Sequence, residues 1–305
     1  MSAVQAATAP AAGAVVDTQV EPPRRSSGRI GYLLLLPGIL WLLVFFAIPT
    51  VQLVGTSLYG NTGSLDTGYS MSWSFGNYLD ALGDYSGPFL RSLYYSVACT
   101  VLAVLLGYPL AYAIAFKSGR WRNLMLVAVI APFFTSFLVR TLAWKAILSD
   151  NGVIVNTLQF LHILGPNGRL LATSVAVVTG LTYNFLPFMV LPLYASLEKI
   201  DPRLIEAGAD LYASPFTAFR KITLPLSMPG LVAGTLLTFI PAAGDYINAQ
   251  LLGTPRQYMI GNVIDNLFLV QLDYPIAGAC SVVLMIVIVA MVLVYVRRAG
   301  AEELL

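Results

Sequence analysis

The segment IAGACSVVLMIVIVAMVLVYV, residues 276–296, contains no charged side chain. A helix that crosses the hydrocarbon core of a bilayer needs about 20 mostly apolar residues, and this segment is long enough to do so. A lone strand in lipid would leave its backbone N–H and C=O groups without hydrogen-bond partners, so the segment is expected to be helical. The sequence therefore predicts an integral membrane protein.

The remainder of the chain has the same apolar character. Of its 305 residues, 57% are hydrophobic and 10% are charged, whereas a soluble globular chain carries about 25% charged residues. That composition excludes a soluble enzyme, a disordered chain and a coiled coil. The formal net charge of +2 is too small to indicate nucleic-acid binding. One histidine and two cysteines give no cluster from which to build a metal site.

Five more apolar stretches are long enough to cross a bilayer. Together with the first segment they predict an all-α integral membrane protein with six transmembrane helices, at residues 30–54, 89–116, 124–147, 170–196, 226–246 and 275–296. Two outer connections contain half-apolar stretches, and each stretch predicts a short interfacial or re-entrant helix, at residues 153–164 and 259–269.

Basic residues predict how these helices are oriented, because short cytoplasmic loops carry an excess of Lys and Arg. With the N-terminus inside, twelve of the 17 basic residues fall on the cytoplasmic side: Arg24, Arg25, Arg29, Lys117, Arg120, Arg122, Lys199, Arg203, Arg220, Lys221, Arg297 and Arg298. Both termini are then cytoplasmic. Residues 1–29 are predicted to be a disordered tail, residues 55–88 an outer (periplasmic) loop, and residues 298–305 a second cytoplasmic tail.

The one sizeable cytoplasmic connection, residues 197–225, contains two helix start signals. Asp201-Pro202 and Ser214-Pro215 each combine an N-cap residue with proline at the first helical position, while Pro225 closes the segment. We expect two short helices at an angle. The first is amphipathic, and an interfacial helix without a partner would show the same pattern, so periodicity alone leaves both interpretations open.

This connection resembles the cytoplasmic loop of binding-protein-dependent ABC transporter permeases. That loop reads Glu-Ala-Ala, three residues, Gly, nine residues, then Ile-x-Leu-Pro. The spacing is the same here, with matches at Glu206, Ala207, Ile222, Leu224 and Pro225, and with Asp210 as in the polyamine branch. Gly208 replaces the second alanine and Tyr212 the turn glycine. Tyrosine is strained at the positive φ that glycine would adopt in the turn between the two helices. The alternative is that Ser214-Pro215 sets this turn instead.

Further stretches are similar to the spermidine/putrescine branch of the family, at residues 107–112, 132–144, 186–201, 239–253 and 259–269. The resemblance implies the type I ABC importer permease (MetI-like) fold in a bacterial inner membrane. Residues 30–54 would be an added first helix, and residues 89–297 the permease core of five helices, with the coupling loop at 197–225. The resemblance also implies three kinds of partner: a second, homologous permease, two cytoplasmic ATPase subunits and a periplasmic solute-binding protein. A heterodimer of this chain with a different permease is the favoured arrangement.

The chain lacks the G-x-x-x-x-G-K-[ST] phosphate loop, so ATP and Mg are expected on the partner ATPase and no cofactor on this chain. We expect a transporter subunit, not an enzyme, that moves a small cationic solute, spermidine or putrescine, by alternating access. The same class of permease could carry iron, sulfate, thiamine or an opine-type amine. An intramembrane enzyme is a distant alternative, since no serine–histidine pair or G-x-S-x-G is present.

Ionisable residues within the bilayer are candidates for the solute pathway, because burying them in lipid is costly. Counting along straight helices puts Arg140 and Asp245 at similar heights, so they either pair with each other or line the pathway. Asp265 is a second acidic candidate near the outer gate. Tyr183 and Tyr246 could make cation–π contacts with an amine, although aromatic residues at helix ends are commonly interface anchors.

Overall fold

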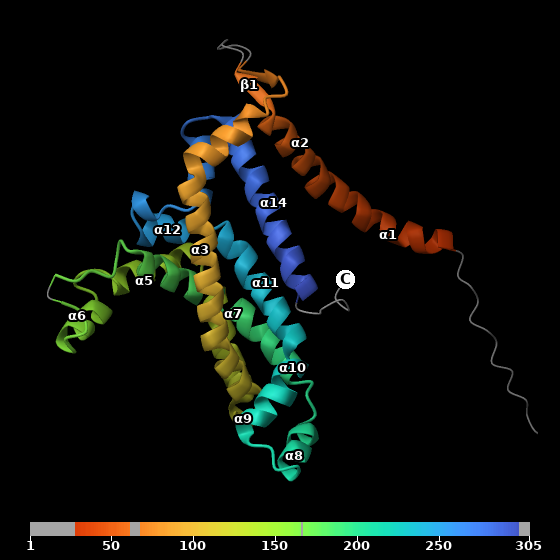
Figure 1. Ribbon diagram of the computed structural model, residues 1–305, viewed down its shortest axis with the longest axis vertical. Helices are drawn as coiled ribbons and strands as arrows, with labels where there is room; N and C mark the ends of the chain where they lie inside the picture. Colours follow the sequence, from red (N-terminus) through yellow and green to blue (C-terminus); the bar gives the residue numbers. More distant parts are fainter. Residues whose placement is uncertain (1–27, 62–67, 166, 299–305) are drawn as a thin grey trace, which may run out of the picture. The chain divides into compact units, whose positions relative to one another are not determined.

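The computed structural model describes residues 28–61, 68–165 and 167–298 (Figure 1). The predicted tails, 1–29 and 298–305, lie outside this part of the chain apart from the residues that begin the first helix and end the last. The chain divides into two compact units, residues 1–50 and 51–305. The first predicted span is helical throughout, as α1 (Gly28–Leu42), a π-helical turn (Leu43–Ala47) and α2 (Ile48–Ser57).

The second predicted span is much longer than its apolar part. After a short antiparallel hairpin of β1 (Tyr59–Asn61) and β2 (Tyr69–Met71), α3 runs over Gly76–Tyr112 and continues as a π-helical turn to Lys117. The predicted loop 55–88 therefore contains the first turns of this helix. Hydropathy misses them because they are polar. A kink at Tyr85 lies just before Pro88, whose missing N–H weakens the helix there.

Helices α3, α7 (Ser174–Leu197) and α11 (Met228–Ala243) form the centre of the second unit (Figure 1). Glycines let them approach closely, as small residues do at helix crossings in membranes. A Cβ on Gly230 would lie 2.5 Å from the Pro192 carbonyl oxygen, and one on Gly234 would lie 2.9 Å from Met189 Sδ. The last span, α14 (Tyr274–Arg298), packs against α3 and against α13 (Ile260–Leu269).

The third predicted span is not one straight helix. It consists of a 3₁₀ turn (Gly119–Trp121), α4 (Arg122–Ile130), a second 3₁₀ turn (Ala131–Phe134) and α5 (Phe137–Ile147). The two halves are bent by 97°. Thr135 and Ser136 leave the helical conformation between them, with ψ of 148° and 139°, so an apolar run of sufficient length changes direction at its middle.

The fifth predicted span has a similar bend at its N-terminal end. The segment Pro215–Leu226, made of α9 (Pro215–Ala218), a π-helical turn (Phe219–Thr223) and α10 (Leu224–Leu226), meets α11 at 66°. The described residues thus hold four single helices long and apolar enough to cross a membrane, and up to six spans if each bent pair counts as one. This agrees with the prediction of six.

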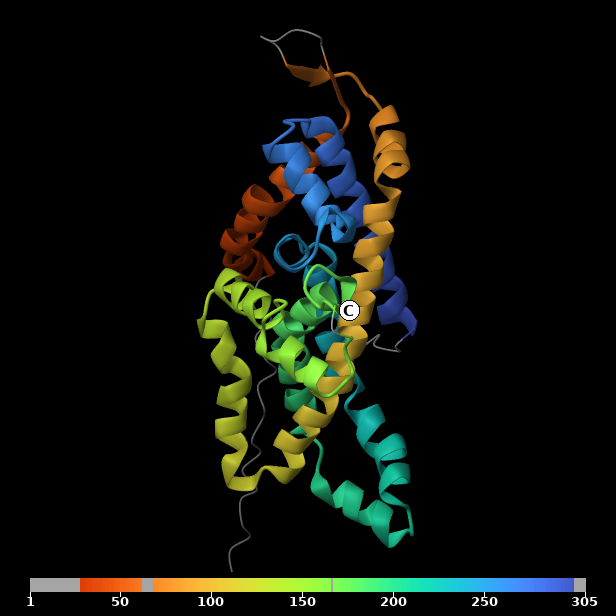
Figure 2. The ribbon, with the colours of Figure 1, turned by 90° about the vertical axis from the view of Figure 1, so that its left-hand side faces the viewer.

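Shorter helices complete the second unit. The two half-apolar stretches are helical as predicted, in α6 (Val153–Phe160) and α13, and α12 (Ile247–Leu252) and a 3₁₀ turn (Pro255–Gln257) lie between α11 and α13. Figure 2 shows the loop with α8 (Pro202–Asp210), α9 and α10 at one end of this unit and the hairpin at the other. A cytoplasmic loop and an outer loop are expected to be separated in this way.

Candidate functional site

The loop at residues 197–225 begins its two helices where the sequence predicts. The Asp201 carboxylate accepts a hydrogen bond from the backbone N–H of Arg203 at 3.0 Å and caps α8. The Ser214 hydroxyl accepts one from the backbone N–H of Thr217 at 3.2 Å and caps α9. In both cases the side chain satisfies an N–H group that has no partner within its helix.

Tyr212 occupies the turn that ends α8. Its φ is +58°, in the left-handed region. The backbone N–H of Ala213 donates to the Gly208 carbonyl at 3.0 Å, and that of Tyr212 donates to the Ala209 carbonyl at 2.9 Å. This is the Schellman arrangement, in which the residue at Tyr212's position is usually glycine. The alternative in which Ser214-Pro215 replaces this turn is therefore wrong, and Ser214 only starts α9.

Gly208, the second departure from the family motif, has a packing role. It is buried, and a Cβ at this position would lie 2.8 Å from Ile222 Cδ1. The missing side chain lets α8 lie against the π-helical turn that carries Ile222. Leu224 is partly buried and packs against the hydrophobic cluster that α3 and α7 form. The remaining motif residues are exposed: Glu206, Ala207, Asp210, Tyr212 and Pro225.

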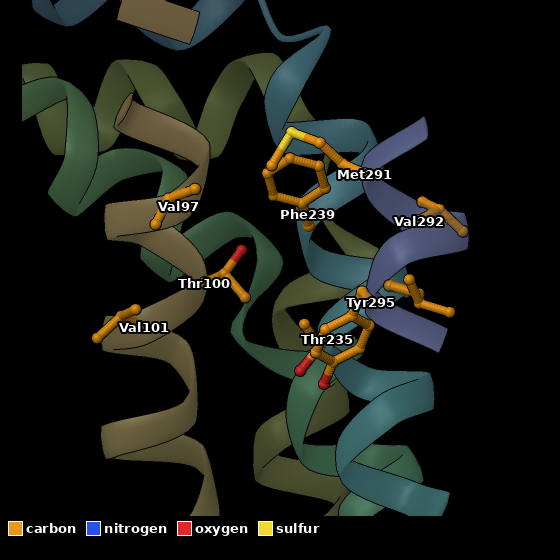
Figure 3. Close-up of a pocket in the computed structure, with 9 residues that line it drawn as sticks. Val97, Thr100, Val101, Thr235, Phe239, Met291, Val292 and Tyr295 are labelled. Atoms are coloured by element: carbon orange, nitrogen blue, oxygen red, sulfur yellow. The ribbon is translucent and has the colours of Figure 1, made fainter. Parts of the chain in front are cut away.

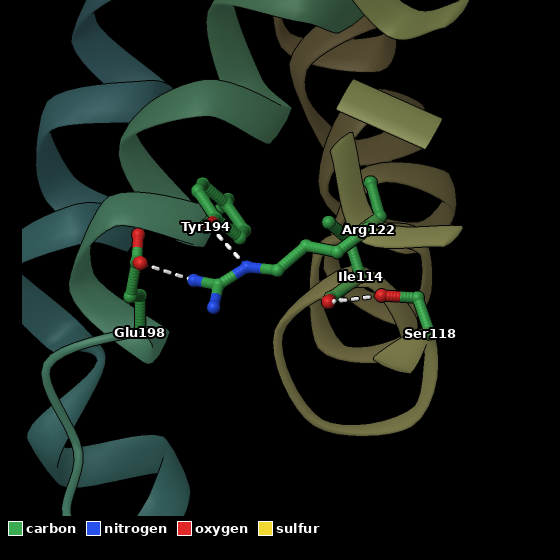
Figure 4. Close-up of polar contacts among 5 residues, drawn as sticks. All are labelled: Ile114, Ser118, Arg122, Tyr194 and Glu198. Carbon is green, nitrogen blue, oxygen red and sulfur yellow. Dashed lines mark hydrogen bonds and ion pairs between the residues drawn. The ribbon is translucent and has the colours of Figure 1, made fainter. Parts of the chain in front are cut away.

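A polar contact ties the start of the third span to the segment just ahead of the loop (Figure 4). Arg122, at the start of α4, donates from Nε to the Tyr194 hydroxyl at 2.5 Å and forms an ion pair with Glu198. Its guanidinium also lies 5.0 Å from the centre of the Tyr194 ring. Because Glu198 directly follows α7, this contact joins α4 to the start of the loop.

A chain of buried polar side chains connects three helices inside the second unit. Asp245 accepts hydrogen bonds from Asn248 through its backbone N–H at 2.9 Å and its side-chain Nδ2 at 3.2 Å. The Asn248 Oδ1 accepts from Asn184 Nδ2 at 3.1 Å, and Asn184 Nδ2 also lies 3.1 Å from the Thr141 hydroxyl. All four side chains are buried. We call Asp245, Asn248, Asn184 and Thr141 the polar chain.

Arg140 and Asp245 do not form the ion pair that the sequence left open. Asp245 receives its hydrogen bonds from Asn248, and the two ion pairs found among the described residues involve neither Arg140 nor Asp245. Arg140 is buried, its Nε and Nη1 have no hydrogen-bond partner, and its guanidinium lies 5.2 Å from the Phe133 ring and 5.7 Å from the Phe137 ring. Counting along straight helices had put Arg140 and Asp245 at similar heights in the membrane. That count does not hold, because the chain turns by 97° ahead of α5.

The other pathway candidates fall into two places. Tyr246 and Asp265 line one groove together with Gly244 and Phe268, and Asn262 Nδ2 donates to the Tyr246 carbonyl at 2.8 Å, which fixes α13 beside the end of α11. Tyr183 instead packs edge-on against Trp144 of α5, with ring centres 5.3 Å apart.

The polar chain was missed by sequence reasoning, although Asn184 and Asn248 are amides within apolar stretches.

A separate cavity of about 180 Å³ lies between α3, α11 and α14 (Figure 3). Valine, leucine, phenylalanine and methionine side chains dominate its lining, with Thr100, Thr235 and Tyr295 as its polar members. No charged residue lines it, so it offers no counter-charge to a cationic solute. The groove of Tyr246 and Asp265, next to the polar chain, is the better candidate.

Comparisons with known proteins agree with this architecture. Residues 103–299 match the family described as binding-protein-dependent transport system inner membrane component. The chain is 36% identical, over 84% of its length and 90% of the relative's, to the spermidine/putrescine transport system permease protein PotB of Haemophilus influenzae. It is 38% identical to the Escherichia coli protein of the same name, over 85% of this chain and 94% of that one.

Solved structures share the fold. A chain of a bacterial alginate ABC transporter, in complex with an alginate pentasaccharide-bound periplasmic protein, aligns with a TM-score of 0.67 at 21% identity, over 88% of this chain and 94% of its own. A chain of the MetNI methionine ABC transporter aligns with a TM-score of 0.53 at 19% identity, over 70% and 94%. The expected importer-permease fold is confirmed, and the chain belongs to the family of binding-protein-dependent transport system inner membrane components.

Proposed function

We propose that this chain is the permease subunit of an ATP-driven importer for polyamines, spermidine or putrescine. The observation that carries the proposal is the capped helix pair of the cytoplasmic loop, with the family's residue spacing, at the end of a bundle of importer-permease fold. The solute is inferred from relatives named for spermidine and putrescine transport. Iron, sulfate, thiamine and opine-type amines are the competing solutes.

The proposed assembly contains four other protein subunits. A second, different permease would complete the translocation path, two ATPase subunits would hydrolyse ATP with Mg on the cytoplasmic side, and a periplasmic protein would deliver the solute. Both termini of this chain would be cytoplasmic, as the twelve basic residues on that side favour. Glu206 and Asp210, exposed on α8, would contact the ATPase, and α8 would move with it when the ATPase dimer closes.

Within the membrane, we assign the polyamine path to the groove of Tyr246 and Asp265 and to the neighbouring Asp245. A protonated amine is attracted by carboxylates in a low-dielectric site and by aromatic faces. The polar chain would hold the Asp245 carboxylate in place. Arg140 and Tyr183 are neighbours of Thr141 and Asn184 in the sequence, so they would lie beside the path without lining its acidic part.

The experiment is the exchange Glu206→Lys in the complete transporter, reconstituted in proteoliposomes with its binding protein. Uptake of labelled spermidine is expected to fall at least tenfold while the complex still assembles, because the reversed charge opposes docking of α8 to the ATPase. The matched control is Asp80→Lys, another exposed carboxylate on the outer part of α3, which should leave uptake unchanged. Normal uptake by Glu206→Lys would contradict the proposed coupling role.

A further inference from the structure

The groove of Tyr246 and Asp265 combines one carboxylate with two open aromatic rings. Its volume is about 320 Å³, and Asp265 is the charged side chain in its lining. Tyr246 and Phe268 both line it, and they are 39% and 51% exposed. Asp265 and Phe268 are three residues apart on α13, so they project from the same face of that helix. The groove therefore presents a negative charge next to an aromatic ring.

Phe268 is supported in this groove by two further rings. Its ring centre lies 5.0 Å from that of Tyr274, at the start of α14, with the ring planes at 71°. Tyr274 in turn lies 6.1 Å from Tyr69 of β2, with the planes at 80°. We call Phe268, Tyr274 and Tyr69 the aromatic row. Edge-to-face packing of this kind is favourable, so the row holds the Phe268 ring while about half of its surface stays open.

The chemistry of the groove separates the competing solutes. Its other side chains are aliphatic, from Ile264, Leu269 and Leu284, and they suit the alkyl stems between the ammonium groups of a polyamine. An anion such as sulfate would be repelled by Asp265, with no cation in the lining to offset it. An iron ion needs several ligands, and in the described part of the chain no three His, Cys, Asp or Glu side chains gather as a metal site.

We propose that Phe268 is a specificity-determining residue for the transported solute, and that its ring takes the ammonium group of a polyamine beside the Asp265 carboxylate. The inference rests on the function proposed above and deepens it, because it names a contact residue and a solute class, the alkylammonium ions. The attraction is a cation–π contact, which strengthens where water is excluded. Tyr274 is a positioning residue that acts through the Phe268 ring.

A side chain of the second permease is the competing occupant, since exposed aromatic residues are also common at protein interfaces. Asp265 favours the amine. An apolar partner surface laid over the groove would bury this carboxylate without a counter-charge, which is costly. An ammonium group on an alkyl stem meets the carboxylate, the ring and the aliphatic side chains at the same time. The amine is therefore the occupant that we test.

The experiment measures uptake of labelled spermidine by the complete transporter in proteoliposomes, with binding protein in excess so that capture is not limiting. Phe268→Leu keeps an apolar side chain and removes the ring, so uptake should fall on the order of tenfold. Phe268→Tyr and Phe268→Trp keep a ring and should stay within about threefold of wild type. The matched control is Phe160→Leu, at an 81% exposed phenylalanine on α6 outside the groove, which should leave uptake unchanged.

The positioning role of Tyr274 is tested by a second pair of variants. Tyr274→Leu removes the edge-to-face support and should lower uptake about threefold, less than Phe268→Leu does. Tyr274→Phe restores the ring and should restore uptake. Thermal midpoints of all variants show whether a loss reflects unfolding, and the effect of Tyr274→Leu should be absent when Phe268 is already leucine. A further loss in that double variant would overturn the positioning role.

Three results would overturn the contact between Phe268 and the amine. They are wild-type uptake by Phe268→Leu, an equal loss in Phe268→Trp and Phe268→Tyr, and loss of the second permease from the purified Phe268→Leu complex. If Phe268→Leu imports spermidine normally while Glu206→Lys does not, the proposed function stands and only this contact fails. If the wild-type transporter takes up no spermidine, the proposed function fails and the contact fails with it.

Discussion

The side-chain amide of Asn184, on α7, donates a hydrogen bond to the side-chain carbonyl of Asn248, on α12, at 3.1 Å. Both residues are buried, at 1% and 0% exposure. Through this bond α7 supports Asn248, which in turn holds the carboxylate of Asp245. The position of the buried acid therefore depends on a residue 61 positions earlier in the chain, on a different helix.

Asn184→Leu should destabilise the protein by about 1–3 kcal/mol, because it leaves the Asn248 carbonyl buried without its donor. Thermal unfolding of the purified permease in detergent measures the effect. Thr238→Val is the matched control, since the Thr238 hydroxyl is buried with no hydrogen-bond partner. Removing it should be neutral or stabilising. Equal losses in both variants would show that the polar chain adds nothing beyond packing.

Asp245→Asn should reduce spermidine uptake most strongly when the polyamine is limiting, by on the order of tenfold, because the variant keeps the shape of the side chain and removes its charge. Uptake by the reconstituted transporter over a range of spermidine concentrations is the measurement. Asp150→Asn serves as the control, because that carboxylate is exposed, pairs with Arg169 and takes no part in the polar chain. Unchanged uptake would remove Asp245 from the path.

Gly230→Ala should cost about 1–3 kcal/mol or more, because the added Cβ would lie 2.5 Å from the Pro192 carbonyl oxygen and 2.5 Å from Ser196 Cβ. Backbone on α7 would have to move away from α11. Gly83→Ala in α3 is expected to stabilise the protein instead. No atom lies within 4 Å of a Cβ at this position, and alanine is the better helix former. The melting temperatures of the two variants, measured side by side, test whether a glycine in these helices matters for close helix packing or only lowers helix propensity.

The contact between Arg122 and Glu198 should contribute little to stability, because the side chains are 33% and 47% exposed and water and salt screen such a pair. A double-mutant cycle with Arg122→Gln and Glu198→Gln measures it. We expect the larger effect on coupling, seen as more ATP hydrolysed per spermidine imported, because the pair joins α4 to the start of the loop. Unchanged stoichiometry in all three variants would limit the contact to a surface role.

Local signals in the sequence predicted part of this architecture well. Asp201-Pro202 and Ser214-Pro215 begin helices because capping depends on a few adjacent residues. Hydropathy identified the last span for a similar reason, since a continuous apolar run needs no distant partner. The direction of a helix is a different matter. The apolar stretch around Thr135 has the composition of a single span, and that composition does not show that the backbone leaves the helical conformation at Thr135 and Ser136.

The candidate site was predicted less well, since it depends on contacts between distant residues. Asp245 stood out as a charge in an apolar region, and a pair with Arg140, the other visible charge, was one of the two alternatives that the sequence left open. The partner found is Asn248, a neutral amide three residues along the chain. Tyr212 shows the same limit in the backbone, because its sequence left open whether Ser214-Pro215 sets the turn instead, and the structure keeps the tyrosine in it.

The 97° break in the third span has a consequence for how the chain is made. Its second half, α5, has 11 residues and at 1.5 Å per residue extends about 16 Å, roughly half of the hydrocarbon thickness. Its neighbours include α7 and α12, both later in the chain. The contacts that α5 makes with α7 and α12 can therefore form only after α12 has been synthesised, so the second half of this span reaches its final packing late in the making of the chain.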